Sequence, residues 1–301
     1  MVEFFNVLIP VFVIFALGYI GEKKIGFDPK TISTMSLYLM TPLLVFQTFY
    51  TNKLTLDYLY IVIYAFSLCL ILILIVCCIS YIKKYNIKET CGLILGSVFM
   101  NNGNYGTPVA LLLFGAAGFD YAIILMVTQS IVMSTIGVYV AARGSDIGGG
   151  LKDTLGVVIR MPVAYGAVFG LLFQYMGISI SPSLMTTIDL VGSAAIPTIM
   201  LVLGMQLAKI SLKNVEYEKV TYALFIKLAI APLVAWGISA LLPIDSLLKQ
   251  VMIIMAGMPA AANTTMYAIQ FNAKPEFVSI CTFISTVLSL ITLPIIFYFV
   301  L

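Results

Sequence analysis

Long apolar runs limit what this chain can fold into more than any other feature. A helix needs about 20 apolar residues to cross the hydrocarbon core of a bilayer, which is about 30 Å thick. Hydrophobic residues make up 61% of the 301 residues and charged residues 10%, whereas soluble domains carry about 25% charged residues. We therefore predict an all-α membrane protein with ten transmembrane helices. Their expected positions are residues 4–21, 31–50, 58–82, 90–116, 119–142, 155–176, 184–207, 219–242, 247–272 and 276–300.

Lysine and arginine are distributed unevenly among the connections between these runs. Twelve fall in the odd-numbered connections, and only Lys53 and Lys249 fall in the even-numbered ones. Because cytoplasmic loops are enriched in Lys and Arg, we expect the odd-numbered connections to be cytoplasmic. Both termini would then be extracytoplasmic, in a multi-pass protein of the cell (inner or plasma) membrane whose solvent is the lipid bilayer.

A Gly-rich polar connection divides the ten runs into two groups of five. Similar residues recur in the two groups, as in the pairs Pro10 and Pro162, and Pro108 and Pro259. Five spans in each group would give the two copies opposite orientations, and inverted repeats of this kind are frequent in transporters. The predicted units are a first repeat at 1–142, a cytoplasmic linker at 143–154 and a second repeat at 155–301.

The fourth and ninth runs, which correspond to each other, are interrupted by residues that favour a helix poorly. Asn and Gly have low helix propensity, and Pro removes a backbone hydrogen bond. A single kink of this kind is usually packed by small residues without any function, but paired breaks in two inverted halves point to a substrate site. The expected breaks involve Gly103, Gly106, Pro108, Gly257 and Pro259, and the expected substrate-binding residues are Asn101, Asn102, Asn104, Asn263, Thr264 and Lys227.

Lys227 is the ionisable residue that lies deepest in a predicted span. An ammonium at that depth costs several kcal/mol unless it is paired or hydrated, and it marks a functional site by default. A substrate carboxylate would suit it, and the alternative is that the side chain reaches back to the cytoplasmic interface. Other polar residues are expected to serve packing: Gln129 as an interhelical hydrogen-bonding group, and Ser279, Thr282, Ser285, Thr286 and Ser289 as a packing face against the interrupted helices.

Several classes of function are disfavoured by what the sequence lacks. The chain has no His and no C-x-x-C pair, so neither a metal site nor a cofactor is expected, and an intramembrane enzyme would lack its commonest base. The small net charge of +3 disfavours a nucleic-acid partner. A gated channel remains an alternative, although the polar residues cluster at one depth and do not form a continuous lining.

The residues in these spans resemble the auxin efflux carrier family, which includes bacterial malate- and malonate-permease-type proteins and the plant PIN carriers. The resemblance rests on loose motifs whose order and spacing are shared over nearly the whole chain. The Pro42-Leu43-Leu44-Val45-Phe46 segment resembles the family's Pro-x-Leu-x-Phe, Asn101 stands seven residues before Pro108, and Lys227 stands five before Pro232. Thr264 departs from the PIN pattern, which has a second proline there, so a bacterial organic-acid permease is the closer match.

This resemblance implies a scaffold of spans 1, 2, 6 and 7 and a moving transport domain of spans 3–5 and 8–10. It also implies a homodimer formed through the scaffold. The implied function is secondary transport or facilitated transport of a small organic anion by an elevator-type movement, with a mono- or dicarboxylate such as malate, malonate or an auxin-like acid as substrate. A sodium-coupled symporter of the bile-acid type is the alternative, and the sequence leaves coupling to protons or sodium open.

Overall fold

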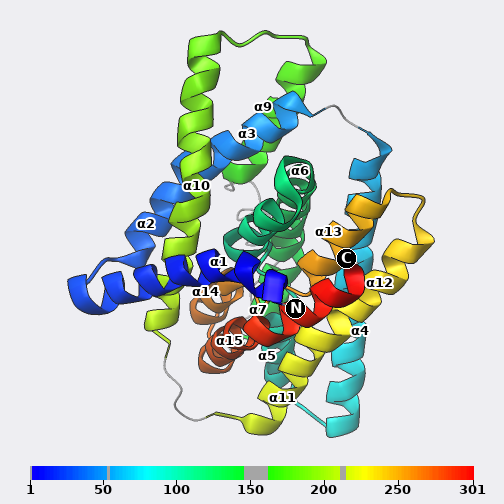
Figure 1. Cartoon of the computed structure of the whole chain (residues 1–301). Helices are drawn as coiled ribbons and strands as arrows, with labels where there is room; N and C mark the ends of the chain where they lie inside the picture. Colours follow the sequence, from blue (N-terminus) through cyan, green and yellow to red (C-terminus); the bar gives the residue numbers. More distant parts are fainter. Residues whose placement is uncertain (1, 53–54, 146–161, 211–214) are drawn as a thin grey trace.

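The computed structural model describes residues 2–52, 55–145, 162–210 and 215–301, and every regular element in these ranges is helical (Figure 1). Labels α and η denote α-helices and π-helical turns. The first half contains α1 (Val2–Ile20), η1 (Gly21–Ile25), α2 (Pro29–Met35), η2 (Ser36–Met40), α3 (Thr41–Thr51), α4 (Leu56–Lys83), α5 (Ile87–Ser97), η3 (Asn102–Gly106), α6 (Thr107–Val132), η4 (Met133–Gly137) and α7 (Val138–Arg143). The second half contains α9 (Pro162–Tyr175), α10 (Pro182–Ala208), α11 (Tyr217–Phe225), η5 (Ile226–Ile230), α12 (Ala231–Leu241), α13 (Ser246–Ala256), α14 (Ala262–Gln270) and α15 (Pro275–Val300).

Within the described ranges, six helical segments are long and apolar enough to cross a membrane. They begin at Pro29, Leu56, Asn102, Pro182, Tyr217 and Pro275. The segment Asn102–Arg143 has 42 residues and is kinked at Gly115, whose φ of 66° departs from helix geometry. The predicted sixth span and the predicted linker 143–154 lie partly outside the described residues. The all-helical prediction is confirmed for the described chain, and the ten-span inverted repeat stays a prediction.

Three of the π-helical turns have a common local cause. η2, η3 and η5 each end two residues before a proline, which is Pro42, Pro108 or Pro232. A proline inside a helix has no N–H to donate, and its ring crowds the carbonyl four residues earlier. A wider π turn just before the ring relieves that crowding, so each proline is absorbed without a break.

Glycines bring the helices of one group into backbone contact. α1 packs on α10, and α3 packs on both α9 and α10. A Cβ on Gly204 of α10 would lie 1.9 Å from the Phe15 carbonyl oxygen of α1, and a Cβ on Gly166 of α9 would lie 2.4 Å from the Pro42 carbonyl oxygen. Only glycine permits this approach, which is the usual role of small residues at helix interfaces in membranes.

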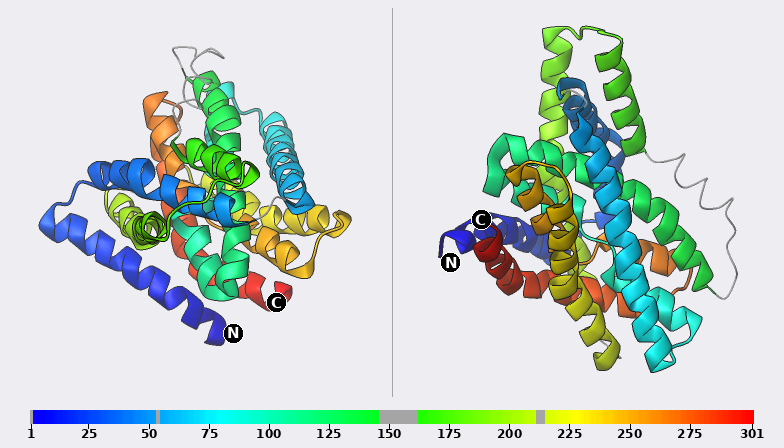
Figure 2. Two further views of the ribbon diagram at one scale, coloured as in Figure 1. Left: turned by 90° about the horizontal axis from the view of Figure 1, so that it is seen from above. Right: turned by 90° about the vertical axis from the view of Figure 1, so that its right-hand side faces the viewer.

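The remaining helices form a second group, in which α15 and α4 each contact several others. α15 contacts α5, α11, α13 and α14, and α4 contacts α6 and α12. The beginning of α1 and the end of α15 lie side by side in both views (Figure 2). Both ends of the described chain therefore lie close to each other.

Candidate functional site

Two helices are interrupted, and they belong to the two runs in which the sequence predicts breaks. α5 ends at Ser97 and the helix resumes at Asn102, while α13 ends at Ala256 and the helix resumes at Ala262. The two unwound segments cross each other as a short antiparallel bridge between Met100 and Ala260. The Asn101 N–H donates to the Pro259 carbonyl at 2.8 Å, and the Ala261 N–H donates to the Phe99 carbonyl at 3.0 Å. Each break thus supplies hydrogen-bond partners for the other, as unwound backbone at membrane depth requires.

The polar face of α15 holds this crossing from one side. The Ala260 N–H donates to Ser285 Oγ at 3.0 Å, and the Tyr105 hydroxyl lies 2.9 Å from Ser289 Oγ. Thr265 and Thr282 are joined by their hydroxyls at 3.3 Å. These contacts confirm the predicted packing face for Thr282, Ser285 and Ser289, whereas Ser279 and Thr286 donate to carbonyls of their own helix and Ser279 lines the larger cavity.

A small cavity of about 60 Å³ lies at the crossing, large enough for about two waters. Its polar lining is made mainly of carboxamides: Asn101, Asn102, Asn104, Gln129 and Asn263. Asn101 and Asn102 are 4% and 5% exposed. Asn101 Nδ2 and Asn102 Oδ1 have no hydrogen-bond partner among the described residues. The Thr41 hydroxyl, which also lines the cavity, has no partner among these residues either. Three unpaired buried polar groups therefore adjoin the same cavity, and each would cost about 1–3 kcal/mol if left unsatisfied.

Two helix N-termini also meet at this cavity. The helix that starts at Asn102 and the helix α14 that starts at Ala262 both contribute their first residues to its lining. The first N–H groups of a helix lack intrahelical partners and carry about half a positive charge. These N–H groups and Asn101 Nδ2 are donors, and Asn102 Oδ1 is an acceptor, so the described lining offers hydrogen-bond donors to a ligand without a charged side chain.

A second cavity, of about 940 Å³, continues from the first. The two cavities share five lining residues: Leu37, Ser130, Val163, Ala262 and Asn263. The described charged residues that line the larger cavity are Asp28, Lys30, Lys209 and Glu276, and all four are exposed. They lie in or beside the connections that the Lys and Arg distribution predicts to be cytoplasmic, so the larger cavity is a vestibule with its rim at that end.

Only some of the predicted site residues lie at the small cavity. Asn101, Asn102, Gly103, Asn104 and Asn263 are brought together at the small cavity. Pro259 lies in the unwound segment, whereas Pro108 lies seven residues beyond Asn101 in a continuous helix, because η3 absorbs it. Gly103 and Gly106 lie within η3, so the first break is at 98–101 and not at the predicted residues Gly103, Gly106 and Pro108.

Three other predicted residues lie outside the described lining of the small cavity. Thr264 is fully buried, and its hydroxyl donates to the Ala261 carbonyl at 2.7 Å. Gly106 and Gly257 leave room for neighbours, since a Cβ would lie 2.8 Å from Met255 Sδ at Gly106 and 2.5 Å from Ile296 Cδ1 at Gly257. These residues support the crossing and do not face the cavity.

Lys227 is fully buried in η5 and lines neither cavity. Its ammonium nitrogen has no hydrogen-bond partner among the described residues. A lysine side chain that extended to the cytoplasmic interface would be partly exposed there. Because Lys227 is fully buried, that alternative is not supported. A direct contact between Lys227 and a substrate stays a prediction.

Sequence reasoning missed three polar residues of the small cavity: Thr41 at the start of α3, and Gln129 and Ser130. Gln129, which we expected to serve interhelical packing, lines the small cavity, and Ser130 lies where the two cavities join. Gln129 and Ser130 belong to α6 beyond the Gly115 kink. The sequence signal was a pair of polar residues within an apolar run, but only the tertiary arrangement shows which way they face.

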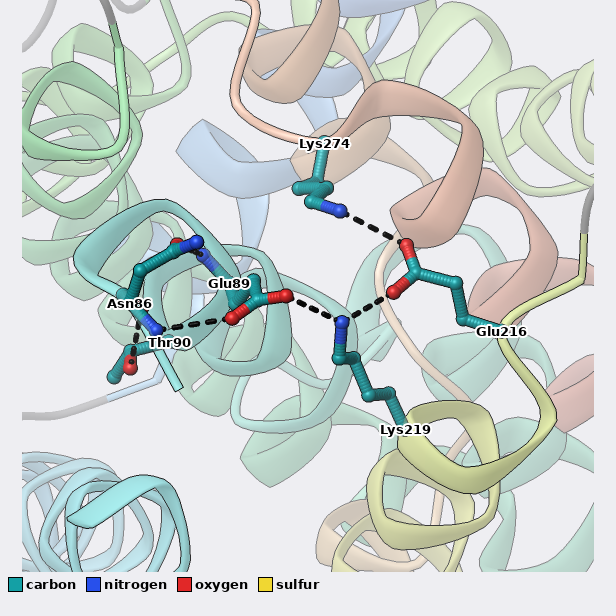
Figure 3. A network of polar contacts seen from close by, with 6 residues as sticks. All are labelled: Asn86, Glu89, Thr90, Glu216, Lys219 and Lys274. Carbon is teal, nitrogen blue, oxygen red and sulfur yellow. Dashed lines mark hydrogen bonds and ion pairs between the residues drawn. The ribbon is translucent and has the colours of Figure 1, made fainter. Parts of the chain in front are cut away.

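A network of ion pairs ties three elements together at the predicted cytoplasmic end (Figure 3). Lys219 of α11 pairs with Glu89 of α5 at 2.6 Å and with Glu216, and Lys274 pairs with Glu216 at 2.9 Å. Glu89 also forms a capping box with Asn86 at the start of α5. Hydrogen bonds from the Lys219 ammonium and the Asn86 N–H hold the pKa of Glu89 below its usual value.

Comparison with known proteins gives matches along almost the whole chain. The family described as membrane transport protein matches residues 3–147 and 151–297. An uncharacterized transporter of Methanothermobacter thermautotrophicus is 27% identical over 289 residues, covering 94% of this chain and 91% of that protein. An uncharacterized transporter of Methanocaldococcus jannaschii is 26% identical over 302 residues, covering 96% of each chain.

Proposed function

The chain belongs to the membrane transport protein family, and from this premise we propose that it is a secondary transporter or facilitator of a small organic anion. The observation that carries the proposal is the cavity at the crossing of the two breaks. It offers the buried, unpaired Asn101 Nδ2 and two helix N-termini to one ligand. Anionic oxygens are the groups that such donors bind best.

The packing supports two groups of helices with different roles, a scaffold and a group that carries the site. α1, α3, α9 and α10 are in close backbone contact, and they would form the scaffold. The crossing breaks belong to the group around α15, which would carry the site. The family match has two parts, 3–147 and 151–297, which agrees with two repeats joined near the Gly-rich linker.

In this proposal the cavity is open toward the cytoplasm. Residues of both groups line the vestibule, among them Leu37 and Val163 from one and Asn263 from the other. An elevator-like shift of the transport group along the scaffold would move the crossing toward the other side of the membrane. Dimerisation through the scaffold is part of the proposal and rests on the family resemblance.

Transport of labelled carboxylates into proteoliposomes tests the proposal. The wild-type protein should give saturable uptake and counterflow, and Asn101→Ala should lose at least 90% of this flux while reconstituting normally. Asn52→Ala is the matched control, because Asn52 lies at the end of α3 and lines neither cavity. Equal flux in the wild-type protein and Asn101→Ala would remove the crossing from the mechanism, and conversion of the substrate to another compound would indicate an enzyme.

A further inference from the structure

Thr41, at the start of α3, is a buried polar residue to which the proposed function assigns no role. It is 4% exposed and lines the small cavity. Its hydroxyl has no hydrogen-bond partner among the described residues. A buried hydroxyl is unfavourable unless a ligand or a water pairs with it. Because a hydroxyl can both donate and accept a hydrogen bond, Thr41 can serve a ligand in either way.

Threonines in comparable positions use their hydroxyls within their own helices. A helical Thr often donates to the carbonyl four residues earlier. Thr48, also in α3, donates to the Leu44 carbonyl at 3.2 Å. Thr107 precedes a proline as Thr41 does, and it donates to the Gly103 carbonyl at 2.7 Å. The unpaired hydroxyl of Thr41 is therefore not a general consequence of helix geometry or of a following proline.

Thr41 lines the cavity from the scaffold group, whereas the carboxamides line it from the other group. α3 packs on α9 and α10, while Asn101 and Asn263 belong to the crossing and Gln129 belongs to α6. The other scaffold residues in the described lining are apolar, and they are Leu37, Val163 and Ile199. A substrate in this cavity would therefore meet carboxamides on one side and the Thr41 hydroxyl on the other.

A contact from the scaffold group cannot persist when the two groups move past each other. A hydrogen bond is lost once its donor and acceptor are more than about 3.5 Å apart. In the proposed elevator-like shift the crossing moves along the scaffold, so the Thr41 hydroxyl and the substrate would separate. Thr41 would then stabilise the loaded protein only in the conformation that is open to the vestibule. Such a differential contact is what allows a ligand to favour one conformation over another.

We infer that Thr41 is a substrate-binding residue of the scaffold, whose hydroxyl binds the substrate in this conformation and releases it during the shift. This inference rests on the proposed function, since it adds a residue to the same site. Binding energy that is present before the shift and absent during it slows the shift. Loss of the hydroxyl therefore weakens substrate binding and accelerates the movement of the loaded protein.

Thr41→Val tests the inference, because it replaces the hydroxyl with a methyl group of similar size. Binding of malonate, malate and phenylacetate to the purified protein is measured by calorimetry. Exchange of the same labelled acids is measured in proteoliposomes with equal concentrations on both sides. For the acid that the wild type exchanges, we expect at least tenfold weaker binding, as for the loss of a hydrogen bond to a charged group. The KM of exchange should rise, and the maximal exchange rate should equal or exceed that of the wild type. Thr41→Ser should restore binding.

Thr48→Val is the matched control, and it should bind and exchange as the wild type does. Thr48 is also 4% exposed in α3, but it lines neither cavity and its hydroxyl stays within the helix. Wild-type binding by Thr41→Val would overturn the inference while leaving anion transport intact. A maximal exchange rate below that of the wild type would also overturn it, because the hydroxyl would then act during the shift. If none of the three acids were exchanged, or if Asn101→Ala exchanged them at the wild-type rate, the proposed function would be overturned and the inference with it.

Discussion

The hydrogen bond from the Ala260 N–H to Ser285 Oγ joins the backbone of the second break to α15. Ala260 and Ser285 are both fully buried. Ser285→Ala removes the acceptor, while the volume lost is one oxygen atom. A buried N–H that loses its partner costs about 1–3 kcal/mol. The crossing should therefore open more easily by that amount, while the rest of the fold is retained.

Amide hydrogen exchange followed by mass spectrometry measures this local opening. Because 1.4 kcal/mol corresponds to a factor of ten, exchange of peptides that contain residues 257–262 should accelerate by about 5- to 150-fold. Carboxylate uptake should fall as well, since Ala261 and Ala262 line the small cavity. Peptides from α1 and α10 should exchange at the wild-type rate.

Ser134→Ala is the matched control for this variant. Ser134 is also fully buried, but its hydroxyl donates only to carbonyls of its own helix, those of Ser130 and Ile131. Its removal leaves no N–H without a partner, so exchange around Ala260 should stay unchanged. The reasoning would be refuted if Ser285→Ala exchanged no faster than Ser134→Ala at residues 257–262.

Three further predictions concern charge and packing. The pKa of Glu89 is lowered in the folded protein, so its ion pair stabilises the fold fully above the unfolded-state pKa of about 4.3 and is lost as the pH falls through the folded value. Denaturation from pH 7 to 3 should show this loss in the wild type and a smaller one in Glu89→Gln; identical pH profiles would argue against it. Gly204→Ala should lower the unfolding free energy by about 3 kcal/mol or more, because the new Cβ would meet the α1 backbone. Gly237→Ala is the control: its Cβ meets nothing within 4 Å, so it should be neutral or raise the unfolding free energy by up to about 1 kcal/mol. Comparable thermal stability of the two variants would contradict the packing account. Lys227→Met should raise the unfolding free energy by about 1–3 kcal/mol, because it removes a buried charge that has no hydrogen-bond partner in the described ranges, and it should reduce uptake. Unchanged stability would mean that the ammonium is solvated in the membrane.

The sequence predicts the two breaks because their causes are local. Asn, Gly and Pro weaken a helix wherever they stand, so clusters at 101–108 and 257–263 could be identified without tertiary information. The exact position of the first break could not, because a π turn absorbs Pro108 and moves the unwound segment to 98–101. The local composition predicts that the helix is weak near 101–108. The contact with the second break determines which residues of that helix unwind.

Which polar residues face the cavity depends on the tertiary arrangement. Asn101 and Asn263 are predicted directly by the breaks. Thr264, the residue after Asn263, does not face the cavity, because its hydroxyl donates to the Ala261 carbonyl. Gln129 faces the cavity because α6 turns at Gly115 and returns past the crossing. The orientations of Thr264 and Gln129 cannot be predicted from hydrophobic periodicity, because their runs are apolar on all sides.

The bridge between Met100 and Ala260 has a consequence for how the protein is made. Asn101 and its acceptor Pro259 are 158 positions apart in the chain, and a ribosome adds about 5–20 residues per second. For roughly 8–32 s the newly inserted first break has no complementary strand, and its exposed amides and carbonyls need water or an insertion factor in the meantime. We expect the nascent N-terminal half to stay near the translocation machinery until the C-terminal half arrives.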